Sequence, residues 1–193
     1  MELGQKMSNS IAEAHDLTSD ELLAIVVSGM QSGMPIETIP LLRSLIQRDN
    51  SNGRAHYLLA VEQSVIGLLD EADKSFSCAI EHCPELTEAR IQYAMLLIAL
   101  GKNSKAKMVL QGYVHAPQSV AGDCCQILIK LASGDLGHLQ TMLESLTVVN
   151  EADRPTVQLV GTFVEEHIQR ALEDEANLES RFMGRYARLE RPH

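Results

Sequence analysis

Residues 53–86 read GRAHYLLAVEQSVIGLLDEADKSFSCAIEHCPEL, and their pattern of small, apolar and helix-ending residues decides the fold. Two apolar helical stretches lie on either side of Gly67, and glycine suits the left-handed backbone conformation that often ends a helix. Pro84 closes the second stretch, because proline cannot continue a helix. This segment therefore predicts two helices joined by a tight turn.

Glycine recurs at a nearly constant spacing along the chain. Gly33, Gly67 and Gly101 are 34 residues apart, and Gly134 follows 33 residues later. Each of these glycines follows one apolar helical stretch and precedes another. A period of this length indicates an array of helical repeats. We predict an array over residues 18–152, with repeats at about 19–52, 53–86, 87–118 and 119–150.

Residues 53–86 resemble the tetratricopeptide repeat (TPR). The TPR motif has a large and a small residue on its first helix, which correspond to Leu59 and Ala60 here. The glycine at the turn of the motif corresponds to Gly67. The second helix carries the small, aromatic and small residues of the motif at Ala72, Phe76 and Ala79. The repeat at 87–118 keeps the same pattern at Tyr93, Ala94, Gly101, Ala106 and Leu110. The resemblance implies an all-α protein, a right-handed α-solenoid of three to four TPR-like helical hairpins.

Several local signals predict helix ends. Thr18 and Glu21 have the spacing of a capping box, and Pro35 suits the first turn of a helix. Thr87 is predicted to cap the helix of the third repeat, and Asp153 precedes the last helix. Apolar and polar residues do not alternate along any segment, so we expect no sheet.

The last helix is predicted from Arg154 to about Arg181, as a long cap on the array within residues 153–193. Its apolar stripe consists of Val157, Val160, Val164, Ile168, Ala171 and Leu178. The end of a solenoid covers a helix of about 10–14 residues, so the second half of this helix needs another partner. We expect a homodimer or partner contact through Ile168, Leu172, Leu178 and Phe182. Residues 1–17 are expected to be flexible, and the basic tail to fray.

Composition limits the possible partners. The 26 acidic residues outnumber the 16 lysines and arginines, which gives a formal net charge of −10 and disfavours nucleic acid as a ligand. The polar start of the chain has no signal-peptide core, and no run of about 18 apolar residues indicates a membrane span. These features predict a cytoplasmic protein.

No pattern of catalytic or metal-ligating residues stands out. Phosphate-binding glycine motifs do not occur. The cysteines Cys78, Cys83, Cys124 and Cys125 form no CxxC pair and are interpreted as reduced, buried thiols. Cys78 and His82 are four residues apart, but no second pair accompanies them, and His56 is interpreted as a packing residue. We therefore expect no cofactor, no metal and no enzyme activity.

A concave groove is the predicted functional surface. In TPR proteins the first helix of each repeat lines this groove, at positions that the resemblance carries over to this chain. They are Leu23, Val27, Met30, Arg54, Tyr57, Val61, Val65, Ile91, Met95 and Ile98. This set is mostly apolar and lacks the cations with which some family members clamp an acidic peptide.

The apolar character of the groove predicts a protein–protein interaction scaffold or chaperone-like adaptor that binds an apolar polypeptide segment. The C-terminal helix of the same chain or a second copy could also fill the groove. The alternative function is a structural subunit that self-assembles through its C-terminal helix.

Overall fold

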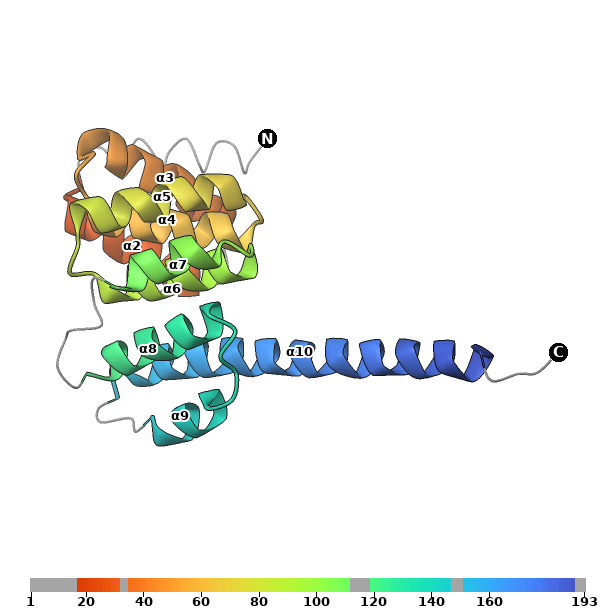
Figure 1. The fold of residues 1–193 in the computed structure, drawn as a ribbon. Helices are drawn as coiled ribbons and strands as arrows, with labels where there is room; N and C mark the ends of the chain where they lie inside the picture. The colour runs from red at the N-terminus through yellow and green to blue at the C-terminus, as the bar shows by residue number, and fades with distance from the viewer. Residues whose placement is uncertain (1–16, 32–34, 112–118, 147–150, 190–193) are drawn as a thin grey trace. The chain divides into compact units, whose positions relative to one another are not determined.

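The computed structural model describes residues 17–31, 35–111, 119–146 and 151–189, and within these ranges every regular element is a helix. The helices are α2 (Ser19–Gln31), α3 (Pro35–Arg48), α4 (Gly53–Val65), α5 (Leu69–His82), α6 (Thr87–Ala99), α7 (Asn103–Gln111), α8 (Val120–Ala132), α9 (Leu139–Ser145) and α10 (Arg154–Leu189) (Figure 1). The all-α prediction is confirmed. The chain divides into two compact units, Met1–Val109 and Leu110–His193.

The first unit contains α2 to α6 and most of α7, from the first three predicted repeats, whereas α8 and α9 of the fourth predicted repeat belong to the second unit. Along the chain, α2 packs on α3, α3 on α4, α4 on α5 and α5 on α6, while α4 also contacts α6. The hairpin of α4 and α5 coincides with the repeat predicted at residues 53–86, and its two helices make the most extensive pairing in the molecule.

The turn glycines adopt the conformation that their positions predict. Gly67, Gly101 and Gly134 have φ values of 79°, 70° and 74°. In each turn, the amide after the glycine donates to the carbonyl five residues before it, over 2.8–3.1 Å. The glycine amide donates to the carbonyl three residues before it. Together these bonds form a Schellman motif, which satisfies carbonyls at the helix end. Gly33 lies outside the described residues.

Gly53 allows the closest approach between α4 and α5. A Cβ atom at this position would lie 2.5 Å from the Cβ of Cys83 and 2.9 Å from its backbone nitrogen. No side chain other than hydrogen fits at that distance without moving α5. The start of α4 is therefore held directly against the end of α5.

The predicted helix starts are confirmed at all but one position. Thr18 and Glu21 form the reciprocal capping box, in which the Thr18 amide donates to the Glu21 carboxylate over 2.8 Å and the Glu21 amide donates to the Thr18 hydroxyl. Helix α10 begins at Arg154, directly after Asp153.

The prediction that Thr87 caps α6 is wrong. Thr87 is the first residue of α6, and its hydroxyl donates to the Glu85 carbonyl before the helix. The hydroxyl of a residue already inside the first turn is no longer placed to accept the free amides of that turn.

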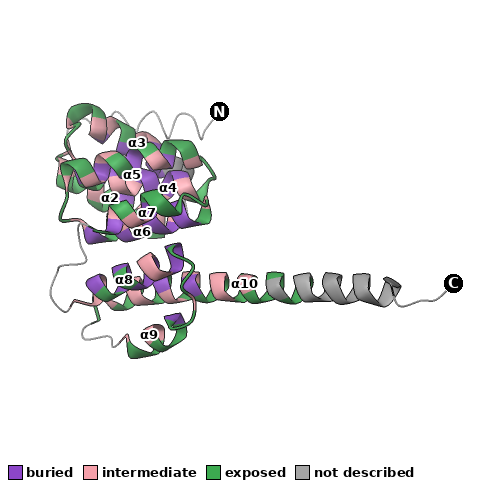
Figure 2. Ribbon diagram, in the orientation of Figure 1, coloured by how far each residue is buried: buried purple, intermediate pink, exposed green. Residues whose placement is uncertain are grey.

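The core of the first unit combines aliphatic side chains with small residues and one aromatic stack, and its buried positions lie between the helices (Figure 2). Ala60, Ala72 and Ala79 are fully buried. Phe76 is 2% exposed and stacks on Tyr93, with ring centroids 5.4 Å apart. Small residues bring the helix axes together, and Phe76 then fills the space between successive hairpins.

The cysteines are not all buried as predicted. Cys124 and Cys125 on α8 are buried, whereas Cys78 and Cys83 are only half-buried. Cys78 lies in the second half of α5, and Cys83 is the C-cap residue that directly follows this helix.

The second unit consists of α8, α9 and α10. Val160 and Val164 on α10 are fully buried, as are Cys124, Cys125 and Leu128 on α8. Helix α10 has 36 residues and ends at Leu189, so the predicted end near Arg181 is wrong. Among the described side chains of α10, Leu172 is 55% exposed.

Replacing Phe76 with alanine should lower the free energy of unfolding by about 3–5 kcal/mol, because a large cavity would open between two hairpins. Urea unfolding followed by circular dichroism measures this loss. The control is Met108→Ala, since Met108 is 73% exposed on α7 and its truncation should change little. Equal effects of the two substitutions would contradict the predicted packing.

Candidate peptide-binding surface

The predicted groove residues on α2 and α4 are exposed or half-buried. Val65 is 69% exposed and Val27 is 40% exposed. Leu23 and Met30 are half-buried and pack beside the core of Leu22, Val26 and their neighbours. On α4, Arg54 is exposed, while Tyr57 and Val61 are half-buried.

The three predicted groove residues on α6 are in a different environment. Ile91, Met95 and Ile98 are 1%, 8% and 8% exposed. In the first unit, apolar surface at the predicted positions is therefore exposed on α2 and α4 and buried on α6.

Tyr57 connects this surface to the core. Its hydroxyl accepts a hydrogen bond of 2.8 Å from the Gln92 side chain on α6, and its ring lies 6.4 Å from that of Phe76. Burial, assisted by the negative charge of Glu88, raises the pKa of Tyr57 to about 12. The phenol therefore stays neutral at physiological pH and provides an apolar ring with a fixed hydroxyl.

A polar network joins α5, α6 and α7, and sequence reasoning missed it. The Asp73 carboxylate accepts from the Tyr93 hydroxyl over 2.6 Å and from Lys105 Nζ over 2.9 Å. Lys102 lies 3.6 Å from the second oxygen of Asp73, and Ser77 shares a hydrogen bond with Tyr93. Asp73 and Lys105 are 32 residues apart in sequence, so no local pattern reveals the pairing.

The ionisation of Asp73 reflects two opposing effects. Burial favours the neutral acid, but the hydrogen bonds from Tyr93 and Lys105 outweigh it and lower the pKa of Asp73. The charged carboxylate thus holds the third hairpin against the second, and we see no role for it in chemistry on a substrate.

Two further polar pairs lie inside the first unit. The Thr38 hydroxyl on α3 donates to the Glu62 carboxylate on α4 over 3.0 Å, and the Ser75 hydroxyl on α5 donates to the Gln63 amide oxygen over 2.8 Å. Both pairs are buried, and the buried side-chain polar atoms of the described residues all have partners.

The residues considered for a metal site serve other purposes. The Cys83 thiol donates to the Glu85 carboxylate over 3.1 Å, and burial raises the pKa of Cys83, which disfavours the thiolate that a metal needs. His82 stacks on His56, with ring centroids 5.7 Å apart, and His56 is buried as predicted. Within the described ranges, no three potential ligands lie close enough to hold a metal ion.

Cys124 is equally unsuited to nucleophilic chemistry. Burial raises the pKa of Cys124 to about 12, and the neighbouring Cys125 and the nearby Asp123 add to the shift. The thiol therefore stays protonated at physiological pH, and a protonated thiol is a poor nucleophile.

The predicted contact residues of the C-terminal helix are placed only in part. Ile168 is half-buried and Leu172 is exposed. The side chains of Leu178 and Phe182 lie outside the described residues. Although α10 is long, no helix among the described residues is apolar enough over 18 residues to cross a membrane.

Comparison with solved structures identifies the fold. A crystal structure of MamA aligns with a TM-score of 0.56 and 15% identity, over 86% of this chain and 86% of that one. MamA residues 41 to the end from Desulfovibrio magneticus RS-1 align with a TM-score of 0.54 and 16% identity, over 82% of this chain and 96% of the other. TTC0263, a thermophilic TPR protein in Thermus thermophilus, gives a TM-score of 0.59 and 15% identity, over 86% of this chain and 98% of that one.

The protein therefore has a TPR-like, all-helical fold. Identities of 15–16% are evidence for the shared fold alone. Neither the family models nor the curated proteins contain a match to this chain.

Replacing Asp73 with asparagine should lower the free energy of unfolding by about 1–3 kcal/mol at pH 7, the range for hydrogen bonds to a charged group. Because folding lowers the pKa of Asp73 below its ordinary 3.8, this stabilisation is fully present above pH 3.8 and is lost as the pH falls from there through the lowered pKa of the folded state.

Urea unfolding between about pH 3 and pH 7 tests both expectations. The difference between wild type and variant should be constant from about pH 5 upward and should shrink at the acidic end. Glu81→Gln, which removes an exposed carboxylate from the same helix, is the control. If the difference in unfolding free energy between wild type and Asp73→Asn increased on acidification, Asp73 would not be held in its charged form.

Proposed function

We propose that this protein is a non-catalytic scaffold that binds an apolar segment of another polypeptide on the surface formed by α2 and α4. The observation that carries the proposal is the exposure of Val27 and Val65 at positions that line the peptide groove in TPR proteins. Exposed apolar side chains grouped on one surface mark interaction sites in soluble proteins.

The ligand would gain affinity mainly from apolar contact. Val27 and Val65 supply exposed aliphatic area, and Tyr57 supplies a fixed aromatic ring with its hydroxyl already bonded to Gln92. Rigid aromatic residues lose little conformational entropy on binding and are frequent anchors in interfaces. An adaptor of this kind would recognise its partner by shape and apolar area, consistent with a chaperone-like role in the cytoplasm.

The proposal that the protein is not an enzyme rests on the hydrogen bonds and protonation states of its titratable groups. Asp73 bridges two helical hairpins, and the raised pKa values of Tyr57 and Cys124 leave both groups protonated. Groups engaged in this way are poor candidates for proton transfer or nucleophilic attack at neutral pH.

Replacing Val65 with aspartate should abolish partner binding and leave the fold intact, since the side chain is 69% exposed and a buried charge at the interface would be costly. Affinity capture with wild type identifies the partner, and titration of the purified partner then measures the loss, expected to exceed about tenfold.

Met108→Asp is the matched control, because Met108 is an exposed apolar residue on α7, outside the predicted groove. The proposal requires that Met108→Asp binds as wild type does. If Val65→Asp also retains full affinity, the partner does not use this surface.

A second candidate function, self-assembly through α10, is favoured by the exposure of Leu172 on a helix that continues to Leu189. At about 1.5 Å per residue, α10 extends for about 54 Å, whereas Val160 and Val164, the buried residues among its described side chains, lie in the first third. A second copy or a partner would contact this helix at Ile168, Leu172, Leu178 and Phe182.

Truncating the chain after Ala171 should leave the helical hairpins folded and convert a dimer into a monomer. Light scattering at several protein concentrations measures the mass of both proteins, and circular dichroism checks the fold of the truncated one. If the full-length and truncated chains are both monomeric and equally soluble, α10 does not mediate self-assembly.

A further inference from the structure

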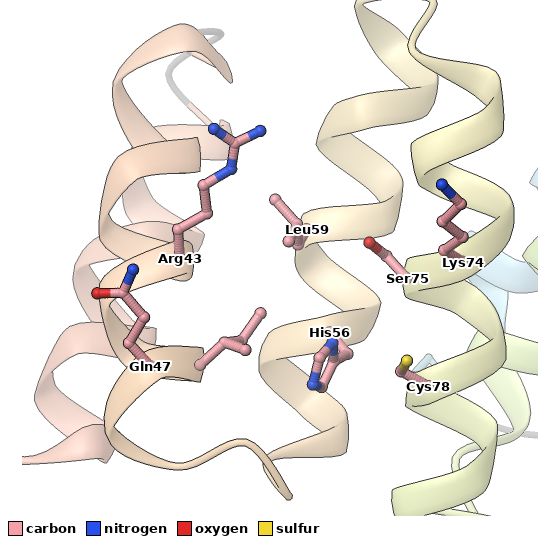
Figure 3. A pocket seen from close by; sticks show the side chains of 8 residues that line it. Arg43, Gln47, His56, Leu59, Lys74, Ser75 and Cys78 are labelled. Carbon is pink, nitrogen blue, oxygen red and sulfur yellow. The ribbon is translucent and has the colours of Figure 1, made fainter.

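A second surface, on the other side of the first unit, carries a pocket of about 290 Å³ (Figure 3). Helix α3 contributes Arg43, Ile46 and Gln47 to its walls, α4 contributes His56 and Leu59, and α5 contributes Lys74, Ser75 and Cys78. All eight residues belong to the same compact unit.

The pocket and the predicted groove use opposite faces of α4. Leu59 lines the pocket, and it is two residues from both Tyr57 and Val61, which is about 200° around an α-helix. The pocket therefore lies between α3 and α5, on the far side of α4 from the surface that carries Val65. A ligand in one site does not occupy the other.

The charge of the pocket is opposite to that of the whole chain. Arg43 and Lys74 are exposed and make no ion pair with any described residue, and none of the eight lining residues is acidic. By contrast, Lys102 and Lys105 lie against Asp73. In a protein with a net charge of −10, two unpaired cations at one pocket form a local site for an anion.

Two other polar groups of the pocket already have hydrogen-bond partners. The Ser75 hydroxyl donates to Gln63, and His56 Nε2 lies 3.0 Å from the Asn50 carbonyl. The aliphatic side chains of Ile46 and Leu59 also line the pocket. The cavity thus combines an apolar lining with a positive rim on two opposing helices.

The size of the cavity limits its occupant. Sites for free small molecules usually measure about 300–1,000 Å³ and enclose most of the ligand. A pocket of about 290 Å³ that is open to solvent encloses a single side chain, whose affinity must come from the larger molecule that carries it.

We propose that this pocket binds a partner polypeptide at an aliphatic side chain that is followed or preceded by glutamate or aspartate. The aliphatic group packs on Leu59 and Ile46, and the carboxylate lies between Arg43 and Lys74. Arginine provides a planar pair of donors that matches a carboxylate, and lysine adds a second positive charge. The protein then has two docking surfaces, one apolar and one for an acidic segment.

The test uses the full chain and a peptide of sequence Gly-Ser-Glu-Leu-Ser-Gly, acetylated and amidated so that glutamate carries its only carboxylate. Nuclear magnetic resonance of the ¹⁵N-labelled protein follows the amides of Leu59, Ser75 and Cys78 during a titration in the millimolar range. We expect these amides to shift and saturate, and the shifts to weaken at high salt because the contact is ionic.

Two comparison peptides show whether the bound carboxylate belongs to a side chain or to a chain terminus. Gly-Ser-Gln-Leu-Ser-Gly with both ends blocked should bind at least about fivefold more weakly, as expected for loss of exposed ion pairs. A blocked-amine peptide that ends in Gln-Leu with a free carboxylate should also bind more weakly than the glutamate peptide. Tighter binding of that peptide would assign the pocket to a chain terminus and overturn the proposal.

The protein variants separate this site from the groove. Arg43→Gln and Lys74→Gln should each weaken binding by about fivefold, and Arg54→Gln, which removes a cation from the opposite face of α4, should not. Val65→Asp should leave peptide binding unchanged, so failure of one site is distinguishable from failure of the other. Absence of saturable shifts in wild type, or binding by Arg43→Gln and Lys74→Gln as tight as that of wild type, would refute the proposal.

Discussion

The close approach of α4 and α5 is the constraint on which the first unit depends. At Gly53 there is no space for a Cβ atom against Cys83, and the fully buried Ala60, Ala72 and Ala79 keep the helices together along the hairpin. Because this spacing is fixed, the ring of Phe76 meets Tyr93 of the next hairpin at stacking distance. A larger residue at Gly53 would shift α5 and with it every contact that α5 makes.

Polar groups then fix how each hairpin sits against the next. The Thr38–Glu62 and Ser75–Gln63 pairs are buried, and an unpaired polar group in either place would carry a desolvation penalty of about 1–3 kcal/mol. Sliding α3 or α5 along α4 would break these pairs. Apolar packing brings the helices together, whereas these hydrogen bonds select one register among the packings that apolar side chains would tolerate.

Sequence reasoning succeeded where the physical cause is local. The left-handed glycines and the Thr18–Glu21 capping box depend on residues within one turn of each other, and the structure has them as expected. The Asp73 network depends on residues a full repeat apart, so it could not be found without the fold. The long α10 was underestimated because the last residues lack a stop signal as clear as the turn glycines.

Sequence reasoning did not foresee that Ile91, Met95 and Ile98 are buried, and the reason is different from that for α10. Motif positions carried over from a family specify which face of a helix a residue occupies, but they do not specify what covers that face in a particular chain. On α4, sequence reasoning assigned Val65 to the groove, whereas it treated the opposite face only as core. The Arg43 and Lys74 pocket was overlooked because its residues come from three helices and share no sequence pattern.

The two proposed sites thus use opposite faces of α4, and their separation has a functional consequence. Tyr57 and Val61 lie on the apolar side, and His56 and Leu59 lie on the side of the cations. An apolar segment on α2 and α4 and an acidic segment on α3 and α5 would share no contact atoms. Both would rest on the same rigid hairpin core, so the two proposed surfaces could hold two segments of one partner at once and gain affinity from their linkage.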